Sequence, residues 1–174
     1  MGIQFETDYN METLTAMAKG LRKTVRKKRS HRVHIFAAVV LILGLLTILA
    51  TTAGGEPLGA SGVVTLLAML VVILVSLFED KLNAWFARKR LLPGTEHAVA
   101  TFEEDGYVSA TGVTESRFSY AQIVAVAETA RYFVFALSSH HTQAYDKRTI
   151  RGGSVEDFRA FIAEKAGKLV ENIK

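Results

Sequence analysis

Residues 33–78 read VHIFAAVVLILGLLTILATTAGGEPLGASGVVTLLAMLVVILVSLF, two apolar runs joined by a short loop. A helix needs about 20 residues to cross a bilayer core roughly 30 Å thick. Segments 33–52 and 61–79 reach that length. Neither run, from Val33 to Ala50 or from Val63 to Phe78, contains a charged residue or a polar stripe. The stretch therefore predicts a transmembrane helical hairpin.

Basic residues flank the two runs unevenly. Eight Lys and Arg precede the first run, four follow the second within residues 79–90, and the loop carries only Glu56. Because Lys and Arg beside membrane spans stay in the cytoplasm, both termini are predicted to be cytoplasmic. The protein is thus expected to be a two-span protein of the cell (inner) membrane.

Residues 1–90 hold twelve bases against six acids, whereas residues 91–174 hold nine against eleven. The positive charge is therefore concentrated beside the hairpin. Arg26, Lys27, Lys28 and Arg29 are candidate contacts for anionic lipid of the inner leaflet. Such a cluster can also bind nucleic acid nonspecifically, but its position next to a span favours lipid, and no nucleic-acid partner is expected.

Polar chemistry is sparse. The chain has no Cys, which excludes disulfides, thiolate metal sites and a Cys nucleophile. The runs hold no ionisable group of the kind that transport paths need. Their hydroxyls are expected to bond to their own helix, and Gly44 to mark a close helix contact. The hairpin is therefore interpreted as an anchor.

Residues 1–32 form a first unit. Ile3, Phe5 and Thr7 alternate as in a short strand, and Asn10 is placed to cap a following helix. Apolar residues then recur at helical spacing, at Leu14, Met17, Ala18, Leu21 and Val25. This basic amphipathic helix either lies on the inner leaflet or packs on the C-terminal domain.

The hairpin unit covers residues 33–90 and ends with Trp85 and Phe86 among basic residues, as at a membrane interface. Pro93 and Gly94 then mark a domain boundary. Residues 95–174 alternate as in six short strands: 97–102, 107–111, 114–120, 123–127, 132–137 and 142–145. Ser154 and Asp157 begin a last helix whose apolar face runs to Leu169 and Val170. The fold class is α+β, an antiparallel β domain closed by a C-terminal helix and pleckstrin-homology-like (PH-like) by analogy.

Candidate catalytic residues are few. His31 and His34 lie one helical turn apart but are read as interfacial rather than as metal ligands. His140 and His141 point to opposite faces if extended, and no cofactor or metal is expected. Lys147, Arg148 and Arg151 form the one notable surface patch, which either contacts a headgroup or acidic partner or is an ordinary basic turn.

The order of basic helix, apolar hairpin and β-rich domain, with FSYAQIVAVAETARYFVFAL, AYDKRTI and GSVEDFRAFI, resembles the bacterial YcxB-like proteins. These motifs are mostly core spacing and so indicate a fold. The family usually has Pro where this chain has Asp146. The resemblance implies a membrane-anchored PH-like domain and carries over no catalytic residues.

Two functions follow from these features. The first is a non-enzymatic module that presents its cytoplasmic domain at the inner leaflet and binds a protein or anionic lipid, a homo-oligomer being possible. The alternative is an accessory subunit of a transport or envelope-stress system that works through the hairpin itself.

Overall fold

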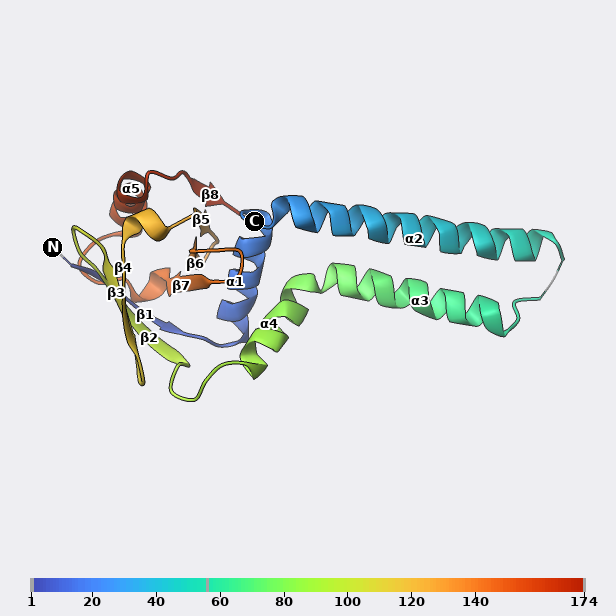
Figure 1. The fold of residues 1–174 in the computed structure, drawn as a ribbon, viewed down its shortest axis with the longest axis horizontal. Helices are drawn as coiled ribbons and strands as arrows, with labels where there is room; N and C mark the ends of the chain where they lie inside the picture. The colour runs from blue at the N-terminus through green and yellow to red at the C-terminus, as the bar shows by residue number, and fades with distance from the viewer. Residues whose placement is uncertain (1, 56, 174) are drawn as a thin grey trace.

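The computed structural model describes residues 2–55 and 57–173 as a β-rich body from which a long helical hairpin projects (Figure 1). The hairpin consists of α2 (Lys27–Ala53) and α3 (Ala60–Leu77), lying side by side. Both helices are long and apolar enough to cross a membrane, and their apolar windows are unburied. Glu56, the loop charge noted above, lies outside the described residues.

The hairpin boundaries differ from the expected ones at both ends. Helix α2 begins at Lys27, so the basic cluster forms its first turn rather than preceding it. Helix α3 ends at Leu77, and Phe78 separates it from α4 (Glu79–Lys89), which runs back toward the body. The first acidic residues after the apolar run thus open a new helix.

The hairpin interior matches the sequence expectation. A Cβ added at Gly44 would lie 2.8 Å from the sulfur of Met69, so glycine permits the close approach of α2 and α3. The Thr47 and Thr65 hydroxyls each donate to a carbonyl one turn back, at 2.9 Å, and Ser76 does so at 2.8 Å. The polar side chains inside both runs are therefore satisfied within their own helix.

The body contains two four-stranded sheets, ordered β1-β2-β3-β4 and β7-β6-β5-β8. The strands are β1 (Ile3–Asp8), β2 (His97–Phe102), β3 (Tyr107–Thr111), β4 (Glu115–Phe118), β5 (Ala125–Glu128), β6 (Tyr132–Ala136), β7 (Thr142–Asp146) and β8 (Val170–Asn172). All six strands expected in the C-terminal segment are present. Strand β1 pairs antiparallel with β2, Phe5 lying opposite Ala100, so residues 3–8 form part of the C-terminal fold.

The last helix starts as predicted and ends early. Ser154 and Asp157 form a capping box at α5 (Val155–Ala166). Gly167 then adopts φ of 60°, a left-handed cap that ends the helix. The prediction that Leu169 and Val170 continue this helix was wrong, because the chain beyond Gly167 becomes β8, which pairs parallel with β5.

The core between the sheets is aromatic. Phe5, Phe102, Phe133 and Phe158 are at most 1 % exposed and meet mainly edge to face. The ring centroids of Phe5 and Phe158 lie 4.6 Å apart. Such contacts add about 0.5–1.5 kcal/mol each beyond the burial of apolar area. A residue of β1 thus sits at the centre of a core otherwise built after residue 95.

Helix α1 (Met11–Lys23) packs on the outer face of the second sheet and contacts α4 as well (Figure 1). Asn10 caps it as predicted, accepting from the N–H groups of its first turn. Leu14 and Leu21 are buried, so the apolar face is used by the body and not by the leaflet. A Cβ at Gly20 would come within 2.7 Å of Val134, so the glycine allows α1 to approach β6.

Candidate functional site

At the hairpin base α1, α2 and α4 meet (Figure 1), and the basic cluster of residues 26–29 lies there, at the start of α2. Arg26 is the residue just before α2. Its guanidinium donates to the carbonyl of Ser139 at 2.6 Å and contacts His140 Nδ1 at 3.0 Å. This side chain therefore fastens the start of α2 to the β6–β7 turn.

Lys27, Lys28 and Arg29 are exposed on the first turn of α2. Within residues 2–55 and 57–173, none of the three forms an ion pair with a carboxylate. Their charges lie on the surface next to Arg26 and remain available to an external anion.

A second anchor joins α1 to α4. Arg22 donates through Nε and Nη2 to the two carboxylate oxygens of Asp80, at 2.7 and 2.6 Å. This two-pronged geometry is typical of the strongest ion pairs, and the hydrogen bond raises the pKa of Arg22. Glu79 makes only longer contacts, 3.8 Å each, with Arg22 and His34. Asp80 is thus fully engaged in the contact between α1 and α4, whereas Glu79 makes weaker ion pairs.

A cavity of about 190 Å³ lies within the hairpin base. Its lining includes the guanidinium-bearing Arg22, Arg26 and Arg29, together with Ser30 and Glu79. Burial and the nearby charge of Arg29 lower the pKa of Arg26. The cavity therefore gathers positive charge with a single carboxylate in its wall.

The patch expected at Lys147, Arg148 and Arg151 is distributed over three ion pairs. Lys147 Nζ lies 2.9 Å from Glu128 and donates to the Thr129 carbonyl at 2.7 Å. Arg148 pairs with Asp146 at 2.9 Å, and Arg151 with Glu6 at 3.1 Å. Arg148 and Arg151 stay exposed, while the ammonium of Lys147 is turned into the body.

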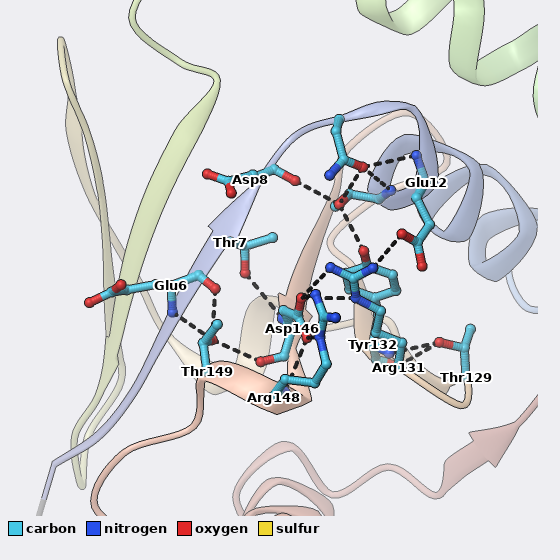
Figure 2. A network of polar contacts seen from close by, with 12 residues as sticks. Glu6, Thr7, Asp8, Glu12, Thr129, Arg131, Tyr132, Asp146, Arg148 and Thr149 are labelled. Carbon is cyan, nitrogen blue, oxygen red and sulfur yellow. Dashed lines mark hydrogen bonds and ion pairs between the residues drawn. The ribbon is translucent and has the colours of Figure 1, made fainter.

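Asp146, at the end of β7, organises a polar network that ties three segments together (Figure 2). Arg131 donates to Asp146 Oδ2 at 2.9 and 2.8 Å and also pairs with Glu12 of α1. The Asp146 N–H donates to the hydroxyl of Thr7 in β1 at 3.1 Å. Asp146 therefore links β7 to β1 through its backbone N–H, and to α1 through its carboxylate and Arg131.

A second buried carboxylate belongs to Glu128 at the end of β5. Arg159 of α5 donates to its two oxygens at 2.6 and 2.7 Å, opposite Lys147. The hydrogen bond from Arg159 is the main cause of its lowered pKa, and Lys147 adds to the effect. The arrangement stabilises the folded body and engages both oxygens of Glu128 with basic side chains.

Other hollows lie on the body, and two of them flank α1 or the strand edges. A mainly apolar groove of about 540 Å³ runs between α1 and the turn that follows β5. A smaller pocket of about 270 Å³, lined by hydroxyl groups, opens between β3, β4 and β7. In it Gln143 accepts hydrogen bonds from Tyr107 and Tyr145, at 2.8 and 2.7 Å, and burial raises the pKa of Tyr145.

Three of the histidines weighed as metal ligands, His34, His140 and His141, make local contacts. The Ser138 hydroxyl accepts from the N–H groups of His140 and His141 and so shapes the β6–β7 turn. His34 Nδ1 lies 2.8 Å from the Ser30 carbonyl of its own helix. Across residues 2–55 and 57–173, no three potential metal ligands come together.

Sequence reasoning missed the acidic members of these clusters, Asp80, Glu128 and Asp146. The signal available was a lone acid at the end of an apolar strand, as in IVAVAE and TQAYD. Acids in such positions are seldom buried without a basic partner, but the partners lie far along the chain.

Comparison with known proteins gives one match. No curated protein and no solved structure matches the chain. Residues 102–162, from the end of β2 to α5, match the family model described as YcxB-like protein. The matched segment includes both buried carboxylates, Glu128 and Asp146, and most of the aromatic core. This segment of the body is therefore similar to the YcxB-like family.

Proposed function

We propose that the chain is a membrane-tethered, non-enzymatic interaction module. In this proposal α2 and α3 cross the inner membrane as a hairpin. Both ends of the chain face the cytoplasm, and the body binds a protein partner or anionic lipid at the leaflet. The observation that carries the proposal is a hairpin whose apolar windows are uncovered and whose base is lined with arginine.

Uncovered apolar helices of this length are costly in water, at about 25 cal/mol per Å² of apolar surface. No face of the body covers them, so lipid is the natural solvent. Basic residues lie on the body side of both helices, and the loop contains no Lys or Arg. This distribution supports a cytoplasmic body.

The way the body is attached supports a fixed presentation. Helix α1 packs on the second sheet and on α4, and Arg22 and Asp80 join the two helices. The body is thereby tied to both ends of the hairpin through packed helices instead of a flexible linker. A surface held in this way meets membrane-bound partners in a defined orientation.

The PH-like assignment belongs to the same proposal. Two mainly antiparallel sheets face each other across an aromatic core, and α5 packs Phe158 and Ile162 into it. Domains of that architecture commonly serve as binding platforms, an analogy at the level of fold. The hydroxyls of Thr47, Thr65 and Ser76 are bonded within their own helices, which supports an anchor over a transport path through the hairpin. The accessory-subunit alternative would instead require these particular spans, so exchanging both for unrelated apolar helices should abolish function only under that alternative.

The test is sedimentation and flotation of the full-length chain. We expect it to sediment with membranes, to resist carbonate extraction and to float with vesicles after reconstitution. Recovery in the supernatant without detergent would refute the proposal. Crosslinking in native membranes with a photoreactive residue at Arg148 then tests for a partner on the body.

A further inference from the structure

The cavity at the hairpin base has features that the anchoring role does not require. It lies between α1, α2 and α4, where α2 begins its apolar run at Val33. Its wall includes Ser30 and Asn83, which can donate hydrogen bonds, besides three arginines. The site therefore combines several donors with net positive charge.

Two of the arginines are fixed by the fold. Arg22 is held by Asp80, and Arg26 by the β6–β7 turn. A guanidinium has five N–H groups, and Arg26 uses two of them on Ser139 and His140. The remaining N–H groups of Arg26 are thus already positioned before any ligand arrives, which lowers the entropic cost of binding.

The charges in the cavity are incompletely balanced. Asp80 neutralises Arg22, while Arg26 and Arg29 have no carboxylate within ion-pair distance among the described residues. Burial lowers the pKa of Arg26, repulsion by Arg29 lowers it further, and the charge of Glu79 only partly offsets the two effects. An anion placed between these two side chains would relieve that repulsion.

The chemistry of the anion follows from the donors and the location. Guanidinium groups match phosphate oxygens in geometry. The cavity also lies at the start of the apolar run of α2, at Val33, which in a spanning hairpin is the depth of the bilayer phosphates. Glu79 in the wall disfavours a second negative charge, so a singly charged phosphodiester fits better than a phosphomonoester.

We propose that the hairpin base is a binding site for the phosphodiester group of one phospholipid, held by Arg26 and Arg29 with Ser30 and Asn83 nearby. The proposal rests on the membrane insertion proposed above. It deepens that function by assigning one lipid to a defined place beside the body, in addition to any diffuse attraction to the basic surface.

The experiment uses the full-length chain purified in an uncharged, phosphorus-free maltoside detergent. Short-chain phosphatidylglycerol is titrated, and bound lipid is counted by native mass spectrometry for the wild type, Arg26→Gln and Arg29→Gln. Arg32→Gln is the matched control, because Arg32 is exposed on the same helix and does not line the cavity. Arg26→Gln also removes contacts to the β6–β7 turn and so can disturb the fold. Arg29 is exposed and, within the described residues, makes no such contact, so Arg29→Gln tests the site without that complication.

We expect one lipid per chain, with affinity falling about tenfold in Arg26→Gln and Arg29→Gln, the loss typical of a hydrogen bond to a charged group, and unchanged in Arg32→Gln. Equal weakening in all three variants would reduce the effect to general charge and overturn the site. Displacement of the lipid by equimolar inorganic phosphate would overturn the phospholipid assignment.

Flotation with vesicles of a phosphorus-free galactolipid separates the two proposals. A chain that floats with these vesicles but retains no phosphatidylglycerol in detergent refutes the lipid site alone. A chain that floats with neither galactolipid nor phospholipid vesicles refutes the membrane proposal, and the site with it.

Discussion

Arg22 and Asp80, 58 residues apart, are joined by two hydrogen bonds of 2.7 and 2.6 Å. The pair connects the last turn of α1, the helix that packs on the second sheet, to the first turn of α4, which follows the hairpin. Both side chains are largely shielded, with 22 and 16 % of their surface exposed. Orientation of the body relative to the hairpin therefore depends on this contact.

Replacing Arg22 with Ala should destabilise the junction by about 1–3 kcal/mol, because Asp80 is left partly buried without its partner. Arg22→Lys should recover only part of the loss, since an ammonium cannot match both oxygens. The measurement is chemical unfolding of the full chain in detergent. Lys23→Ala, an exposed neighbour, serves as control. Equal stability of Arg22→Ala and Lys23→Ala would contradict the prediction.

Gly20→Ala should destabilise the body although alanine favours helix by about 1 kcal/mol. The added Cβ would lie 2.7 Å from Val134 Cγ1, and overpacking of this kind costs about 1–3 kcal/mol. The double variant Gly20→Ala, Val134→Ala should regain part of the loss by making room. If Gly20→Ala raised the melting temperature, α1 would not pack on β6 as described.

Glu128 should make stability depend on pH in the acid range. Arg159 and Lys147 lower its pKa below the ordinary value of 4.5. Its contribution is therefore complete above about pH 4.5 and is lost as the pH falls through the lowered value. The free energy of unfolding of Glu128→Gln should be lower than that of the wild type at pH 7. Between about pH 5 and 3 it should also change less with pH, as chemical unfolding at a series of pH values would show. Parallel profiles for the two proteins would contradict this role.

A fragment of residues 95–174 should fail to fold, contrary to a division of the chain at residue 95. It lacks Phe5, which is fully buried among the core aromatics, and the cover that α1 gives the second sheet. A chain in which a Gly/Ser linker replaces residues 28–78 retains β1, α1 and α4 and should fold. Circular dichroism and amide-proton dispersion compare the two; a folded 95–174 fragment would refute the expectation.

Local patterns were sufficient for most of the fold. Alternation located the strands from His97 to Asp146, and the Ser154 capping signal located the start of α5. The C-terminus was mistaken because Leu169 and Val170 continue a helical spacing. Gly167 ends the helix through its left-handed conformation, and the pairing of β8 with β5 is a long-range interaction that periodicity cannot reveal.

Long-range contacts were also what the sequence could not reveal about the candidate site. The sequence located the basic cluster at residues 26–29, whose composition and place beside an apolar run are local properties. It could not show that Arg26 reaches the β6–β7 turn or that Lys147 turns inward to Glu128. Tertiary packing decides these partners. Lys147 therefore forms an ion pair inside the body, whereas Arg26 lines the cavity at the hairpin base.

The central claim is that the hairpin crosses the membrane with the body on the cytoplasmic side. Because the chain has no Cys, single cysteines at Gly54, between α2 and α3, and at Ser154, before α5, can be probed with an impermeant thiol reagent on intact cells. We predict labelling of Gly54→Cys alone, with Ser154→Cys reacting only after the cells are opened. Labelling of Ser154→Cys in intact cells would contradict the claim.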